Sequence, residues 1–175
     1  MNEGRIAARK HPADLPDDKL LLQCGRKHMR RSGPGGSNRN KVETAVILVH
    51  EPTGITSEAN ERRSQAENLT NAVFRLRVKL ALDYRCVLSK DYVPGALWQS
   101  RIAKGAIRCN PEHHDFPSML AEALDVINAH EWNVPEAAKA LLTTTSQLVK
   151  FLKDDWHALS LVNAKRVALG LHPLQ

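Results

Sequence analysis

The chain has 175 residues, of which 42% are hydrophobic and 25% charged, so it can bury a core and is too apolar for global disorder. Its net charge is +6, and the positive excess lies in residues 1–117, which contain 20 Lys and Arg and 13 Asp and Glu. Residues 118–175 contain 5 Lys and Arg and 6 Asp and Glu. The imbalance predicts a polyanionic partner for the front of the chain and leaves RNA, DNA and an anionic membrane surface open.

The sequence of residues 1–59 predicts a short helix and short strands joined by turns. In chain order these are a flexible N-terminus (1–14), a short helix (15–23) and three strands (24–31, 42–50 and 55–59). The β-branched residues of 42–50 support the middle strand. The turn Pro52-Thr53-Gly54 connects it to the next strand, which predicts an antiparallel hairpin.

Residues 64–82 predict an amphipathic helix. Its apolar stripe has steps of three and four residues and consists of Leu69, Val73, Leu76 and Leu80. Ser64 followed by Glu67 matches a capping box. A sheet covered by this helix predicts a small α+β domain over residues 15–82.

The rest of the chain predicts a connecting segment and then an all-α unit. Pro and Gly interrupt residues 83–117, so we expect one short helix or strand pair there, anchored to a core by Trp98. Residues 118–175 predict a C-terminal unit of four helices. We expect Thr145 or Ser146 to cap the third helix, and Trp132 and Trp156 to lie in the core or, second, to anchor an interface.

One loop combines glycine with positive charge. Residues 30–41 read Arg-Arg-Ser-Gly-Pro-Gly-Gly-Ser-Asn-Arg-Asn-Lys. Glycine allows the backbone to take a positive φ and to approach another surface closely, and cations attract phosphate. The pattern therefore indicates a loop that reaches into nucleic acid.

This loop and the motifs after it resemble the catalytic domain of the peptide chain release factors, including the short rescue members that act without a stop codon. The resemblance covers about residues 20–82 and keeps the order and spacing of the motifs. They are Arg31-Ser32-Gly33-Pro34-Gly35-Gly36, Asn40-Lys41-Val42-Glu43-Thr44-Ala45-Val46, Leu48, His50, Pro52-Thr53-Gly54-Ile55, Arg63-Ser64-Gln65 and Asn68.

The resemblance implies a loop that enters the peptidyl transferase centre of the large ribosomal subunit. There it would promote hydrolysis of the ester of P-site peptidyl-tRNA without a cofactor, with Gly35, Gly36 and Ser37 as the catalytic residues. The implied contacts to RNA phosphates are made by Arg30, Arg31, Arg39, Lys41, Arg62 and Arg63. Solvated charges at a helix start are an equal explanation for the last two.

Codon-independent action is what the resemblance implies for this chain. There is no room for a codon-reading domain before residue 20, and the C-terminal helical unit does not look like one. We therefore expect a role in translation termination of the ribosome-rescue type. The helical unit is expected to dock another protein or ribosomal RNA.

The loop departs from the family at one position. The defining tripeptide Gly-Gly-Gln is here Gly35-Gly36-Ser37. Ser37 keeps the backbone N–H, and a single donor to a developing oxyanion is worth ~3–4 kcal/mol. It loses the long amide side chain that positions water, and a misplacement of ~1 Å can cost a hundredfold in rate. We expect weakened hydrolysis; the alternative is a catalytically inactive ribosome- or RNA-binding relative.

Two further groups have weaker interpretations. Cys109, His113, His114 and Asp115 are metal-ligand types without a standard zinc spacing, so we expect a turn with helix-capping groups and no metal. Residues 133–152 are similar to helix-turn-helix units of bacterial regulators, but the second helix offers few cations. DNA binding is therefore the less favoured alternative function.

The cysteine count and the apolar windows indicate the compartment. Three cysteines form no metal-ligand pair, which predicts free thiols in a reducing cytoplasm. The N-terminus lacks the apolar core of a secretory signal. No window approaches the ~20 apolar residues of a membrane span, so we expect a cytoplasmic protein with no membrane partner.

Overall fold

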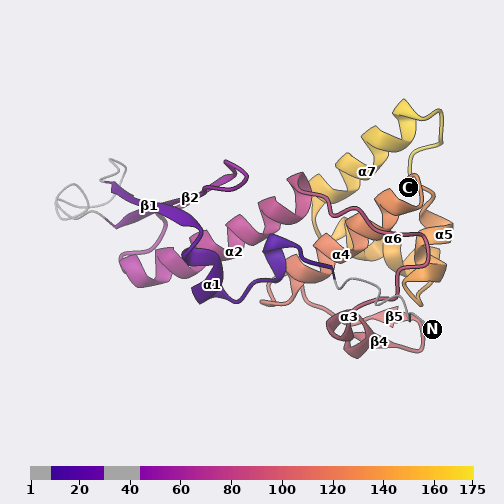
Figure 1. The fold of residues 1–175 in the computed structure, drawn as a ribbon, viewed down its shortest axis with the longest axis horizontal. Coiled ribbons are helices and arrows are strands. Elements are labelled where there is room, and N and C mark those ends of the chain that lie inside the picture. Colours follow the sequence, from indigo (N-terminus) through magenta and orange to yellow (C-terminus); the bar gives the residue numbers. More distant parts are fainter. Residues whose placement is uncertain (1–8, 30–43) are drawn as a thin grey trace, which may run out of the picture. The chain divides into compact units, whose positions relative to one another are not determined.

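The structure, a computed structural model, describes residues 9–29 and 44–175 (Figure 1). Its architecture is the expected α+β class, with a small antiparallel sheet, a packed helix and a C-terminal helical region. The chain divides into two compact units. The sheet unit is Pro12–Leu80, and the helix-rich unit contains the described residues 9–11 together with Ala81–Gln175. The domain boundaries expected from the sequence stay predictions.

The sheet unit is built on three strands in the order β1-β2-β3. They are β1 (Cys24–Met29), β2 (Ala45–His50) and β3 (Thr56–Ala59), and both pairings are antiparallel. The predicted hairpin is therefore confirmed. Its turn ends at Gly54, whose φ of 72° lies in the left-handed region that glycine adopts without steric cost.

Helix α2 (Gln65–Asp83) packs on one face of this sheet (Figure 1). Ser57 lies opposite Leu48 in the β2–β3 register, and its hydroxyl donates to the carbonyl oxygen of Ala72 at 2.7 Å. Strand residues alternate between faces, so this bond identifies the face that carries Leu48 as the one under α2. The core between them contains Val46, Leu48, Ala72, Val73, Leu76 and Leu80.

The chain before the sheet closes one end of this core. A 3₁₀ turn (Pro12–Asp14) and helix α1 (Asp17–Leu21) precede β1, and Leu20 is fully buried. The guanidinium of Arg77, itself buried, donates to the carbonyl oxygen of Ala13 at 3.0 Å. This bond ties the start of the unit to α2.

The helix-rich unit is organised around α4 (Phe116–Ala129), which is buried from Phe116 to Ile127. Before it come α3 (Ala96–Ser100) and the hairpin of β4 (Ile102–Ala103) and β5 (Ala106–Ile107), so the segment has both a helix and a strand pair. Trp98 is fully buried, and its indole N–H donates to the carbonyl oxygen of Leu141 at 2.8 Å. The predicted anchoring role of Trp98 is confirmed.

Two buried acids on α4 hold the segment that follows α2. Asp125 accepts a hydrogen bond from the backbone N–H of Cys86 at 2.9 Å and forms an ion pair with Arg9 at 3.0 Å. Glu122 accepts from the hydroxyl of Tyr92 at 2.9 Å and from the backbone N–H of Gly95 at 2.6 Å. These contacts explain how an almost fully buried helix accommodates two carboxylates.

Helices α5 (Val134–Ala140) and α6 (Thr145–Lys153) form a helix-turn-helix, as the sequence suggested. In the turn, Leu142 has a φ of 56° and an exposed side chain. The expected cap at Thr145 or Ser146 is wrong by one residue. Thr144 caps α6, because its backbone is extended and its hydroxyl accepts from the N–H of Gln147 at 3.2 Å.

The last helix corrects one prediction. Trp132 is buried as expected, but Trp156, the first residue of α7 (Trp156–Ala168), is 70% exposed. Asp155 caps α7 through the N–H of Ala158, and Ala158 and Val162 supply its buried face instead. The core position expected for Trp156 is therefore wrong.

Candidate functional site

The residues that flank the predicted catalytic loop belong to two paired strands. Gly35, Gly36 and Ser37, with the cations Arg30, Arg31, Arg39 and Lys41, lie outside the described residues. The residues that flank them are described: β1 ends at Met29, β2 begins at Ala45, and these two residues are partners in the antiparallel register. Met29 and Ala45, which flank residues 30–44, are therefore neighbours at one end of the sheet.

The β1 side of this edge is bonded to the first turn of α2. The side-chain amide nitrogen of Gln65 lies 2.8 Å from Nδ1 of His28, and both side chains are exposed. His28 pairs with Val46 in the sheet register, which places it on the face covered by α2. The bond thus joins the end of β1, just before the loop, to the first turn of α2.

The β2 side is bonded to the same helix by Asn68, which is fully buried. Its amide nitrogen donates to the carbonyl oxygen of Thr44 at 2.8 Å and to that of Arg62 at 2.9 Å. Its amide oxygen accepts from the backbone N–H of Arg62 at 2.9 Å. One side chain therefore holds both the residue that ends the loop and the chain that enters α2.

Arg62 and Arg63 form an exposed basic corner beside this bond network. Neither side chain makes an ion pair with a described residue, whereas the nearby Arg75 is paired with Glu61 at 2.9 Å. Guanidinium groups that have no ion-pair partner among the described residues suit phosphate contacts. Their predicted role in RNA binding stays a prediction.

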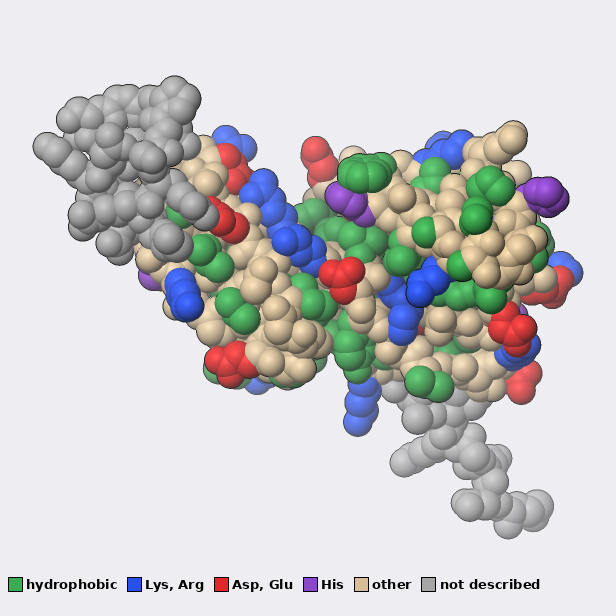
Figure 2. Space-filling view, turned by 90° about the horizontal axis from the view of Figure 1, so that it is seen from above, with side chains coloured by type: hydrophobic (Ala, Val, Ile, Leu, Met, Phe, Trp, Pro, Cys, Tyr) green, Lys and Arg blue, Asp and Glu red, His purple; other side chains and the backbone are tan. Residues whose placement is uncertain are grey.

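The sheet unit carries further exposed cations besides Arg62 and Arg63. Figure 2 shows blue Lys and Arg side chains over the part of the molecule next to the grey loop residues. Those exposed in the sheet unit are Lys19, Arg26, Lys27, Arg62, Arg63, Arg75 and Lys79. No helix within residues 9–29 and 44–175 has both the length and the apolar character needed to cross a bilayer.

His50 stabilises the opposite end of β2. It is buried, its Nδ1 lies 2.7 Å from the hydroxyl of Thr53, and its Nε2 lies 3.0 Å from the side-chain oxygen of Gln23. Burial lowers the pKa of His50, which favours the neutral ring. This histidine connects the turn after β2 to the chain before β1, so its role is structural.

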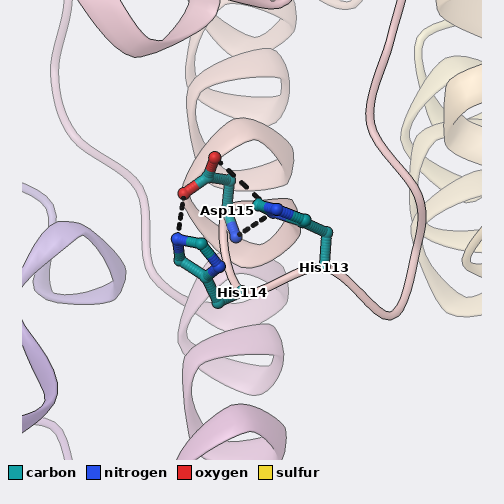
Figure 3. Close-up of side chains that lie close together, drawn as sticks. All are labelled: His113, His114 and Asp115. Carbon is teal, nitrogen blue, oxygen red and sulfur yellow. Dashed lines mark hydrogen bonds and ion pairs between the residues drawn. The ribbon is translucent and has the colours of Figure 1, made fainter.

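A second polar cluster lies at the start of α4 (Figure 3). His113, His114 and Asp115 are the group of potential metal ligands found among the described residues, and their ligand atoms lie within 4.8 Å of one another. However, Asp115 is already bound by the guanidinium of Arg101, which also lies 3.4 Å from Nε2 of His113. A metal ion here would have a cation beside it.

The charges explain what this cluster does instead. Burial acts to raise the pKa of Asp115, but the hydrogen bond from Arg101 and the two imidazoles outweigh it and hold the pKa below its usual range. Nδ1 of His113 accepts the backbone N–H of Asp115 at 3.1 Å. The cluster therefore connects Arg101, the residue just before the β4–β5 hairpin, to the N-terminus of α4. The expectation that no metal binds stays a prediction.

Gln65 and Asn68 belong to a motif of the sequence, but the bonds that they make were not predicted from it. The sequence did contain a signal for Asn68. This residue lies four residues before Ala72 and continues the four-residue spacing of Ala72, Leu76 and Leu80, which are all fully buried. A polar residue in a buried stripe needs partners. The expected stripe instead began at Leu69, which is only half-buried.

The comparisons with known proteins concern the same part of the chain. Residues 17–92 match the model of the RF-1 domain. The chain is 53% identical over 67 residues to the chloroplastic peptide chain release factor PrfB1 of Arabidopsis thaliana, which covers 38% of this chain and 14% of that protein. It is 51% identical over 67 residues to peptide chain release factor 1 of Chlorobaculum tepidum, which covers 38% and 18% respectively.

A third relative, peptide chain release factor 1 of Streptococcus pyogenes, is 45% identical over 60 residues, covering 34% of this chain and 16% of that protein. The chain thus spans less than a fifth of the length of these relatives. The matches support a relationship between its sheet-containing part and the peptide chain release factor family.

Proposed function

We propose that this protein binds the ribosome and promotes hydrolysis of the ester that joins a nascent peptide to the P-site tRNA. The observation that carries the proposal is the match of residues 17–92 to the RF-1 domain. The sheet unit supports it, because both ends of the segment that carries Gly35, Gly36 and Ser37 are bonded to one helix.

The proposed chemistry is attack of water on the ester carbonyl carbon. The bond between that carbon and the ribose oxygen then breaks, the ribose oxygen takes one proton of the water, and the other proton goes to solvent. The products are a free peptide carboxylate and a tRNA hydroxyl. Negative charge develops on oxygen during this step, and a fixed backbone N–H stabilises it. We assign that donor to Ser37, with Gly35 and Gly36 allowing the backbone path.

The cations around the loop would hold it in RNA. Phosphate contacts orient a protein without reading sequence. Arg30, Arg31, Arg39 and Lys41 flank the glycines, and the exposed corner of Arg62 and Arg63 lies where Asn68 holds the backbone. The partners proposed are large-subunit ribosomal RNA and P-site peptidyl-tRNA, in the cytoplasm.

We propose that this action needs no stop codon and serves ribosome rescue. In the described chain, the residues after the RF-1 match continue as α3, the β4–β5 hairpin and four helices. We propose that this helix-rich unit docks on ribosomal RNA or on another protein. DNA reading is less favoured, since Lys150 and Lys153 of α6 are followed by Asp154 and Asp155.

Ser37 favours one competing proposal, a ribosome-binding relative without hydrolytic activity. A peptide-release assay separates the two. Ribosomes that carry labelled P-site peptidyl-tRNA are mixed with the natural chain, Ser37→Gln and Gly36→Ala, with a stop codon, a sense codon or no codon in the A site.

The proposal predicts release by the natural chain in all three ribosome states, faster release by Ser37→Gln, and little by Gly36→Ala. Release by Ser37→Gln alone supports the inactive relative. No release by any variant, together with failure to co-sediment with ribosomes, contradicts both.

A further inference from the structure

Two side chains of α2 bind the two ends of the loop segment. Gln65 is bonded to His28, near the end of β1, and Asn68 is bonded to Thr44, just before β2. Residues three apart on a helix lie on the same side of it. The loop ends are therefore attached at two neighbouring points of one helix face.

The helix is a firm base for this attachment. Its residues Ala72, Leu76 and Leu80 are fully buried, and the carbonyl oxygen of Ala72 accepts the Ser57 hydroxyl. A packed helix restricts the positions of the groups attached to it far more than an exposed turn would. The direction in which the chain leaves β1 and enters β2 is thus tied to the core of the sheet unit.

We propose that Gln65 and Asn68 are positioning residues for peptide release, which set the direction in which the loop leaves the sheet. This inference rests on the proposed function. Neither side chain acts on the ester. Because a misplacement of ~1 Å can cost about a hundredfold in rate, removing either attachment is expected to slow the reaction even where ribosome binding is unchanged.

Asn68 adds a second coupling. The same amide that holds Thr44 also holds both backbone polar groups of Arg62. The loop end and the basic corner are therefore kept at a fixed separation. A loop and an RNA-binding corner that moved independently would not reach their targets together.

The Gln65–His28 bond distinguishes positioning from stability. Both side chains are exposed, so the bond competes with water and its loss changes folding little. A variant that lacks this bond is expected to keep its fold and still to lose release rate. Asn68→Ala is a less clean test, because three backbone partners lose a bond at once.

The experiment measures three quantities for the full chain: the release rate at saturating protein, ribosome affinity by co-sedimentation, and the thermal unfolding midpoint. The variants are Gln65→Ala, His28→Ala, the double variant, and Asn68→Asp, which keeps the acceptor for Arg62 but not the two donated bonds. Thr70→Ala, an exposed change on the same helix, is the matched control. All are made with Ser37 and again with Ser37→Gln.

The expected result is that Gln65→Ala and His28→Ala each slow release about tenfold with affinity and unfolding midpoint unchanged, and that the double variant is no slower than either single one. Asn68→Asp is expected to lose more. Thr70→Ala is expected to match the parent.

Release rates for Gln65→Ala and Asn68→Asp equal to that of Thr70→Ala would overturn the positioning role while leaving the proposed function intact. A parent that releases nothing, with Ser37 or with Gln at position 37, would overturn the proposed function and this inference together. Slower release accompanied by an equal fall in unfolding midpoint in every variant would also overturn it.

Discussion

The side-chain nitrogen of Asn68 lies 2.8 Å from the carbonyl oxygen of Thr44, the residue just before β2 and 24 positions earlier in the chain. The remaining polar atoms of that side chain bind the backbone of Arg62. Asn68 is fully buried, so none of these bonds competes directly with solvent at the amide itself. This residue is the central connection at the loop end of the sheet unit.

Replacing Asn68 by Ala is expected to destabilise the sheet unit by about 1–3 kcal/mol, because buried backbone groups lose their partner. Hydrogen exchange of the amides in β1, β2 and β3 measures the change. The matched surface variant Thr70→Ala is expected to stay within about 0.5 kcal/mol. Equal exchange in the two variants would contradict a structural role for the Asn68 bonds.

Trp98→Phe tests the core of the helix-rich unit. The change keeps an aromatic ring near Phe151 but leaves the carbonyl oxygen of Leu141 without its indole partner. We expect a loss of about 1–3 kcal/mol in a urea titration followed by circular dichroism.

Trp156→Phe is the matched control, because Trp156 is mostly exposed. It is expected to change stability by less than about 0.5 kcal/mol. A larger effect at Trp156 than at Trp98 would reverse the assignment of core and surface in this unit.

Leu142→Gly is expected to stabilise the helix-turn-helix. Leu142 has a φ of 56° and an exposed side chain, so glycine relieves backbone strain and gives up little packing. Left-handed backbone costs a non-glycine residue about 1–2 kcal/mol, and the greater freedom of unfolded glycine offsets part of the gain. We expect a rise of a few degrees in unfolding midpoint.

Leu22→Gly is the control for that change. Leu22 is also exposed, but its φ of −65° lies in the ordinary helical region. Glycine has no strain to relieve there and is expected to lower stability. A fall in stability for Leu142→Gly as well would show that the turn carries no strain.

Acid is expected to destabilise the helix-rich unit through His11. Burial and the nearby Arg9 and Arg85 lower the pKa of His11 to about 3, although its bond to the carbonyl oxygen of Tyr84 acts in the opposite direction. Between pH 6.5 and 3 the unfolded chain binds a proton at this ring that the folded chain does not. The free energy of unfolding therefore decreases as the pH is lowered through this window, by at most about 1.4 kcal/mol per pH unit.

The comparison of the natural chain with His11→Gln isolates this contribution. Glutamine keeps an N–H donor and cannot take up a proton. Urea titrations at pH 7.5 and 5.0 are expected to show a smaller loss at pH 5.0 for the variant. Equal losses in the two proteins would place the acid sensitivity elsewhere.

Periodicity predicted the elements of this fold well where one face is buried and the other exposed. The β-branched run of β2 and the apolar repeat of α2 both appear close to the expected bounds. Trp98 was recognised as an anchor because a large aromatic residue in an interrupted segment has few other uses. In these places local pattern and tertiary packing agree.

The errors arise where a neighbouring residue decides the outcome. Three consecutive threonines span the start of α6, and composition alone does not show which of them has the extended backbone of a cap. Trp156 was expected in the core. Asp155 caps α7, and the buried face of that helix carries Ala158 and Val162 and not Trp156. The role of Asn68 depends on Thr44 and Arg62, which only the folded chain brings to it.

The most direct test of the account is the rate at which the natural chain releases labelled peptide from ribosomes that carry P-site peptidyl-tRNA and no codon in the A site. The account predicts release above the rate with buffer alone, and its loss in Gly36→Ala. Absence of release both by the natural chain and by Ser37→Gln, at concentrations that saturate any ribosome binding, would contradict it.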